Sequence, residues 1–106
     1  MIAELQNALQ NLQVAIAPQR QPDTQAVRAW MRSLEAIQSL FQTTVVNADL
    51  PNPDISLAVQ VEINKQLKML ALDLTMLQTI KNEQTWQKRH QQVGDRLVLL
   101  QRYFQG

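Results

Sequence analysis

Apolar side chains recur along the chain at intervals that alternate between three and four residues, in four separate segments. The first segment covers residues 2–16. Because an α-helix has about 3.6 residues per turn, this spacing puts its apolar side chains on one face. Those side chains are Ile2, Leu5, Leu9, Leu12 and Ile16. Pro18 cannot continue a helix, so the pattern predicts an amphipathic helix that ends before it.

The second segment begins at Asp23 or Thr24, both of which are good helix N-caps. Its apolar positions repeat the same spacing and are Val27, Trp30, Leu34, Ile37 and Phe41. Residues 43–46 are all β-branched, which weakens the helix toward its end. Residues 47–54 contain two prolines, and we expect a loop there.

The third segment runs from a cap at Asp54 or Ser56 to about Ile80 and carries two apolar stripes. The first stripe consists of Ile63, Leu67, Leu70, Leu74 and Leu77. The second stripe, on a different face, consists of Met69, Leu72, Met76 and Ile80. A helix that is apolar on two sides is either central in a bundle or part of an oligomer interface. The second stripe therefore predicts a homodimer about a two-fold axis, with burial in the intramolecular core as the alternative.

The fourth segment follows a tight connection at residues 81–83, and its stripe consists of Trp86, Val93, Leu97, Leu100 and Phe104. Gly94 lies in the middle of this helix and costs about 1 kcal/mol relative to alanine. We expect a close approach of the third helix to compensate for that cost. An antiparallel hairpin that turns near residue 82 predicts three facing pairs: Gly94 with Leu70, His90 with Asp73, and Arg102 with Glu62.

Four such segments with short connections and no alternating strand pattern are typical of an antiparallel four-helix bundle. We therefore predict an all-α fold in which residues 1–106 form a single helical-bundle domain. The predicted core takes side chains from each segment: Leu5, Leu9, Leu12, Trp30, Leu34, Ile37, Leu67, Leu70, Leu74, Val93, Leu97 and Leu100.

The composition of the chain argues against several kinds of site. It contains no Cys, which excludes disulfides, thiolate zinc sites and a Cys nucleophile. Ten basic and nine acidic residues give a net charge of +1, whereas a nucleic-acid binder usually needs a strongly basic face. No apolar run approaches the length of a membrane span, and the first 20 residues do not have the pattern of a signal peptide. We therefore expect a cytoplasmic protein that binds neither nucleic acid nor membrane.

His90 is the single histidine and the one candidate for acid–base catalysis. No Ser or Thr nucleophile is indicated beside it, so a structural contact with Asp73 is the alternative that we favour. The carboxylates Asp49, Asp54, Glu62 and Asp73 are too dispersed for a two-carboxylate active site. We therefore expect no enzymatic activity, no cofactor and no metal site.

Basic residues are concentrated in the fourth segment, where residues 81–102 include five Lys or Arg and two acidic residues. The candidates for docking on an acidic partner protein are Lys88, Arg89, Arg96 and Arg102. Arg suits carboxylates because its planar fork binds them bidentately. The alternative is a solvated helix face with internal ion pairs, each of which contributes only about 0–1 kcal/mol when exposed.

Residues between 60 and 104 also form an ordered set of charged and apolar positions. The set consists of Glu62-Ile63-Asn64-Lys65-Gln66-Leu67-Lys68-Met69-Leu70, Asp73, Gly94-Asp95-Arg96-Leu97 and Arg102-Tyr103. In order and spacing it resembles the cyanobacterial heterocyst frequency control protein (PatD) family. The N-terminal half fits that family only in length and helical character.

This resemblance implies a non-enzymatic regulator of cell division and of the frequency of heterocyst differentiation. Members of the family act through contact with the tubulin-like division protein FtsZ. The matching positions are mostly helix-packing residues, so no binding site carries over from the family. A small helical structural or scaffold subunit of another protein assembly is the alternative function.

Overall fold

The computed structural model describes residues 2–46 and 55–104 and contains four α-helices in that part of the chain. They are α1 (Ile2–Ile16), α2 (Thr24–Phe41), α3 (Leu57–Thr79) and α4 (Glu83–Phe104), and a π-helical turn, η1 (Gln42–Val46), extends α2. No strand occurs among these residues, so the predicted all-α class is confirmed. The loop predicted at residues 47–54, with the candidate cap Asp54, lies outside the described residues.

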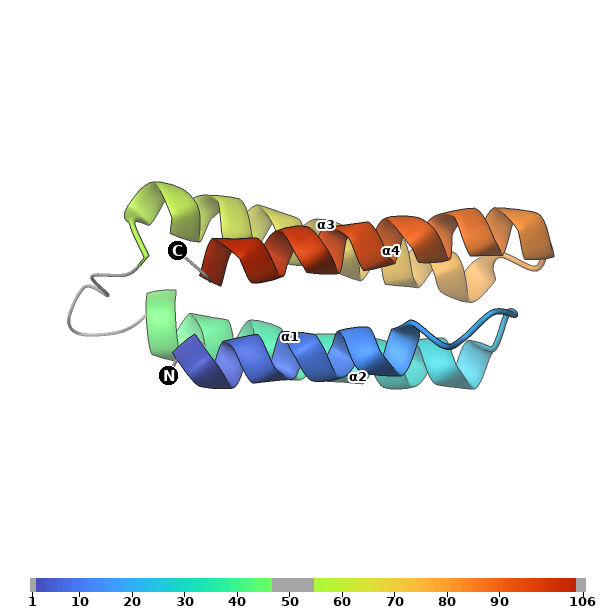
Figure 1. Cartoon of the computed structure of the whole chain (residues 1–106), viewed down its shortest axis with the longest axis horizontal. Helices are drawn as coiled ribbons and strands as arrows, with labels where there is room; N and C mark the ends of the chain where they lie inside the picture. Colours follow the sequence, from blue (N-terminus) through green and yellow to red (C-terminus); the bar gives the residue numbers. More distant parts are fainter. Residues whose placement is uncertain (1, 47–54, 105–106) are drawn as a thin grey trace.

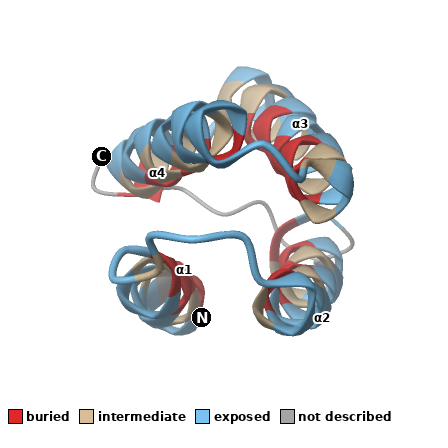
Figure 2. Ribbon diagram, turned by 90° about the vertical axis from the view of Figure 1, so that its right-hand side faces the viewer, coloured by how far each residue is buried: buried red, intermediate tan, exposed pale blue. Residues whose placement is uncertain are grey.

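The helices form an antiparallel four-helix bundle of two layers (Figure 1). Helices α1 and α2 make one layer, and α3 and α4 make the other. Each helix contacts two neighbours, because α1 also packs on α4 and α2 also packs on α3. The bundle measures 46 × 20 × 19 Å. A view along its length shows the buried residues of all four helices turned toward a shared interior (Figure 2).

Short polar side chains cap the N-termini of three of the helices. The Asp23 carboxylate accepts hydrogen bonds from two backbone N–H groups in the first turn of α2, at 3.0 and 3.1 Å. The Ser56 hydroxyl accepts one from the first turn of α3 at 3.3 Å, and the Asn82 side chain accepts one from α4 at 3.0 Å. These bonds satisfy N–H groups that have no partner within the helix. The predicted caps Asp23 and Ser56 are therefore confirmed.

The end of α2 loosens at the predicted β-branched run. The hydroxyl groups of Thr43 and Thr44 donate to the carbonyl oxygen of Leu40 at 3.2 and 2.6 Å. Bonds of this kind compete with the helix's own hydrogen bonds and bend it. The π-helical turn begins at Gln42, yet it still contributes Val45 to the core.

The interior is one continuous apolar cluster to which all four helices contribute. All twelve residues predicted for the core are buried, with at most 5 % of any one exposed. The rings of Phe41 and Phe104 pack edge to face, 6.5 Å apart at 81°. Burial of each such side chain stabilises the fold by about 1.5–3 kcal/mol, so burial of the four apolar stripes holds the bundle together. The side chain of Ile2, the first member of its stripe, lies outside the described part of the chain.

The predicted close approach between Gly94 and Leu70 is wrong. A Cβ atom placed on Gly94 meets no neighbouring atom within 4 Å. Gly94 instead lies on the side of α4 that faces α1, where it lines a hollow together with Gln13 and Ile16. No close contact with α3 therefore offsets the helix-propensity cost of this glycine.

The other two predicted pairs are also wrong. His90 contacts the backbone carbonyl of Ile16 in α1, not Asp73 in α3. Within the described residues, Arg102 forms no ion pair with Glu62. The geometry of an antiparallel hairpin that turns near residue 82 gives only the height of a residue along the bundle. It leaves open whether a residue of α4 faces α3, α1 or solvent.

We predict that Gly94→Ala raises the free energy of unfolding by about 1 kcal/mol, the propensity difference between the two residues in a helix interior. The added methyl group enters open space, so no overpacking opposes the gain. Urea denaturation followed by circular dichroism measures the difference. A loss of stability would show that a neighbouring side chain approaches Gly94 after all.

Candidate protein-binding site on α3 and α4

The layer formed by α3 and α4 carries most of the exposed large apolar side chains among the described residues. Six of the eight lie there: Leu57, Val61, Met69, Leu72, Val98 and Leu99. Single exposed apolar residues are normal on protein surfaces, whereas a contiguous group marks an interaction site. The arrangement of these six residues therefore matters more than their number.

Three of them lie on one face of α3, which points away from the core. Leu57 is 75 % exposed, Val61 is 63 % exposed and Leu72 is 60 % exposed. The exposed Lys65 and Lys68 stand between them, and the five positions follow helical spacings of 4, 4, 3 and 4 residues. We call these five residues the outer stripe of α3. It is about 22 Å long, since a helix rises about 1.5 Å per residue.

The outer stripe was missed in the sequence because the two lysines interrupt its apolar pattern. The signal was present in Leu57, Val61 and Leu72, which share one helical phase over 16 residues. Lysine stems lie along apolar surface while their ammonium groups remain in water. The outer stripe is therefore a continuous surface that combines apolar groups with positive charge.

The second apolar stripe predicted for self-association is only partly open to solvent. Met69 is 38 % exposed and Leu72 is 60 % exposed, whereas Met76 and Ile80 are half-buried. Ile80 packs against the core. Two of the four residues thus remain for an intermolecular contact, and the homodimer stays a prediction that light scattering tests.

Arg96 is held inside the α3–α4 layer. Its Nε donates to a carboxylate oxygen of Asp73 at 2.8 Å, and one terminal nitrogen donates to the amide oxygen of Gln66 at 2.6 Å. Asp73 and Gln66 are the two buried polar residues of the described chain. Removal from water is unfavourable for a carboxylate unless it is paired and hydrogen-bonded. For Arg96, the geometry favours the internal ion pair over docking.

The other three basic candidates of α4 are more accessible. Lys88 and Arg102 are exposed, and Arg89 is half-buried and donates to the side-chain oxygen of Gln92 at 3.2 Å. The structure does not bring all four predicted residues together. Arg89 and Arg96 border one surface hollow, but Lys88 and Arg102 do not line it.

The positive charge is distributed unevenly between the two layers. Residues 55–104 include seven Lys or Arg and four Asp or Glu, a net charge of +3. Residues 2–46 include three of each sign and are neutral. The outer stripe therefore lies on the basic layer of the bundle.

His90 has a packing role on the side of α4 that faces α1. Its Nε2 lies 2.7 Å from the Ile16 carbonyl oxygen, and its ring stacks on Trp86 with centroids 5.0 Å apart. A carbonyl oxygen only accepts hydrogen bonds, so Nε2 carries the proton and donates it. The ring of Trp30 lies 6.4 Å away. His90 thus joins α4 to the end of α1 without a carboxylate partner in this contact.

Comparisons with protein families, with curated proteins and with solved structures found no match to this chain. In the described ranges, no three His, Asp or Glu side chains come together in a group that would hold a metal ion. None of the described helices has the length and apolar character needed to cross a membrane.

We predict that Arg96→Ala lowers the free energy of unfolding by about 2–3 kcal/mol, because it leaves Asp73 unpaired. Breaking a fully buried ion pair costs about 3–5 kcal/mol, and the Arg96 side chain retains 20 % of its exposure, which reduces the effect. Chemical denaturation checks the value. A cost below about 0.5 kcal/mol would mean that the pair behaves like an exposed surface ion pair.

Proposed function

We propose that this chain is a non-enzymatic helical binding module that docks on an acidic surface of a partner protein. The outer stripe of α3 forms the contact, and the accessible basic side chains of α4 lie in the same layer but outside this stripe. One observation carries the proposal. Three apolar side chains that are at least 60 % exposed share a helix face with two lysines.

The charges of the stripe favour an acidic partner over a second copy of the chain. In a two-fold dimer the same patch faces itself. An axis through the middle of the stripe would bring Lys65 and Lys68 of both copies together, and like charges repel. An acidic surface instead neutralises the two lysines while its own apolar groups cover Leu57, Val61 and Leu72.

The resemblance to the PatD family supports FtsZ as the partner. The part of the chain that carries the resemblance includes Lys65 and Lys68, which stand at the centre of the outer stripe. On this proposal the chain modulates FtsZ assembly, and through it cell division and the frequency of heterocyst differentiation in a cyanobacterium. His90 and Asp73 each form a polar contact between two helices. Such structural contacts are consistent with a role without catalysis.

A structural or scaffold subunit of another assembly is the second candidate. It is favoured by the apolar share of the outer stripe, because a permanent subunit interface is more apolar than a transient one. The two functions differ in their response to salt. Charge-driven docking weakens as the Debye length falls from about 10 Å at 0.1 M to about 3 Å at 1 M, whereas a permanent apolar interface persists.

We predict that the double reversal Lys65→Glu with Lys68→Glu weakens co-sedimentation with polymerising FtsZ about tenfold or more. Tenfold corresponds to about 1.4 kcal/mol, a modest loss for two reversed charges at an interface. The matched control is Lys81→Glu with Lys88→Glu, which changes the net charge equally on exposed residues outside the stripe. We expect the control to retain most of its binding, and circular dichroism shows whether both variants stay folded.

Three results would contradict the proposal. Equal weakening by both double variants would show that only net charge matters. Weakening by the control pair alone would move the site to the basic side of α4, where Lys88 was predicted to bind. No co-sedimentation of the unaltered chain would exclude FtsZ polymers as the partner.

A further inference from the structure

The seam between α4 and α1, together with the connection that follows α1, is joined by polar side chains at four heights along the bundle. Three of the contacts are hydrogen bonds to backbone carbonyl oxygens, with lengths between 2.7 and 3.1 Å. The fourth joins two glutamine side chains. From one end to the other the pairs are Gln6 with Phe104, Gln13 with Gln101, Ile16 with His90, and Arg20 with Gln87.

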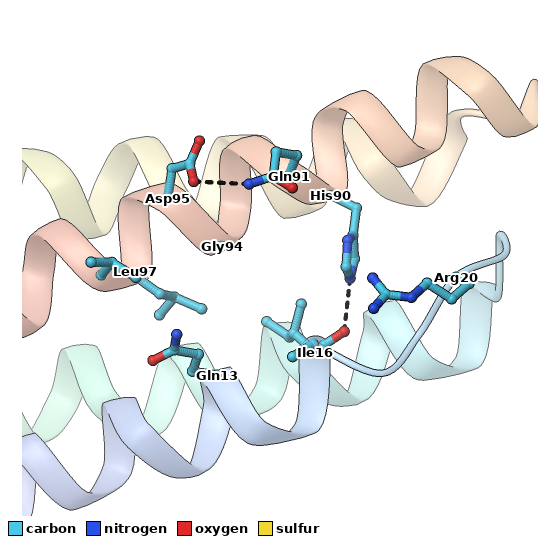
Figure 3. A pocket seen from close by; sticks show the side chains of 10 residues that line it. Gln13, Ile16, Arg20, His90, Gln91, Gly94, Asp95 and Leu97 are labelled. Carbon is cyan, nitrogen blue, oxygen red and sulfur yellow. Dashed lines mark hydrogen bonds between the residues drawn. The ribbon is translucent and has the colours of Figure 1, made fainter.

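The seam is open at one position. Gly94 lies between His90 and Gln101 on α4 and has no side chain to reach α1. A hollow of about 260 Å³ lies there, between α1 and α4 (Figure 3). A Cβ on Gly94 would meet nothing within 4 Å, so the space continues up to the helix backbone.

This hollow has the size for one substituted aromatic ring. An enclosed apolar cavity of about 150 Å³ holds benzene. This hollow is open to solvent on one side, and its volume of about 260 Å³ is enough for a ring with one substituent. Ala17 and Val98 supply the accessible apolar surface of the hollow, and the buried side chains of Ile16 and Leu97 lie behind it. The glycine leaves a flat surface against which a ring can lie. A longer ligand would extend beyond the hollow into solvent.

The rim of the hollow selects for a neutral ligand that forms hydrogen bonds. Arg20 and Asp95 put one positive and one negative charge on it, and these charges balance. Gln91 donates to the Asp95 carboxylate at 3.0 Å, and the Gln13 amide stands on the opposite wall (Figure 3). Amide groups both donate and accept hydrogen bonds, as a hydroxyl group does.

Gly94 itself is the second observation that points to a ligand. Glycine in a helix interior is less stable than alanine, and no steric contact requires it here. What glycine provides at this position is open space. We propose that the hollow at Gly94 is a binding site for a single neutral aromatic group with a hydrogen-bonding substituent, a phenol in its simplest form.

This site is separate from the outer stripe of α3, because it lies on the seam between α4 and α1. It does not depend on the proposed function. A phenol reaches it either as a free small molecule or as a tyrosine side chain of a peptide. In the second case, the peptide groups beside the ring add hydrogen bonds with the rim.

The test is a titration of the chain of residues 1–106 with p-cresol and, separately, with N-acetyl-tyrosinamide, followed by nitrogen-edited NMR spectra. We expect saturable shifts at Gly94 and its neighbours, with a dissociation constant in the millimolar range. Gly94→Leu fills the hollow and should weaken binding at least tenfold, and Gly94→Ala should weaken it less. Ala15→Leu is the matched control, because Ala15 lines a different hollow between α1 and α2. It should leave the affinity unchanged.

The two probes also distinguish the source of the ring. Tighter binding of N-acetyl-tyrosinamide indicates a peptide ligand, and tighter binding of p-cresol indicates a free phenol. The proposal is overturned if neither probe gives saturable shifts up to its solubility limit. It is equally overturned if Gly94→Leu or Gly94→Ala, folded as judged by its spectrum, binds as tightly as the unaltered chain, or if the shifts map to another part of the bundle.

Discussion

In a four-helix bundle, each helix can bury only the side that faces the shared interior, and α3 carries more apolar residues than that side holds. Its first apolar stripe, which faces the core, is fully used, since Leu70 and Leu74 are completely buried. Leu57, Val61 and Leu72 fall outside the reach of α2 and α4 and stay in solvent. Exposed apolar surface is unfavourable in water, so binding of a partner that covers it is favourable. The proposed binding role follows from this excess on one helix.

The polar contacts at the two seams of α4 decide which charges remain for a partner. Arg96 pairs with Asp73 toward α3, and His90 donates to the end of α1. These contacts use groups that, from the sequence alone, were candidates for docking or catalysis. Lys65 and Lys68 form no ion pair among the described residues, so their charge is available to an acidic surface. The bundle thus separates charged residues that hold the helices together from charged residues that stay in solvent.

The sequence predicts the fold well because apolar spacing encodes it directly: the four stripes mark the helices, and every predicted core residue is buried. It predicts the site less well. The facing pairs of Gly94, His90 and Arg102 were wrong because hairpin geometry gives height along the bundle, whereas the direction around α4 depends on packing with α1. The outer stripe was missed because Lys65 and Lys68 interrupt it, and an exposed stripe cannot be told from a buried one before the neighbours of the helix are known.

The most direct test of the central claim, that the outer stripe of α3 is the docking surface, is lysine footprinting. The chain has four lysines, Lys65 and Lys68 in the stripe and Lys81 and Lys88 outside it. The folded chain is acylated with and without FtsZ polymers, and mass spectrometry reports the extent of modification at each lysine. If the outer stripe is the docking surface, Lys65 and Lys68 react several-fold more slowly in the complex while Lys81 and Lys88 are unchanged. Unaltered reactivity at Lys65 and Lys68, or protection at Lys88 alone, would contradict it.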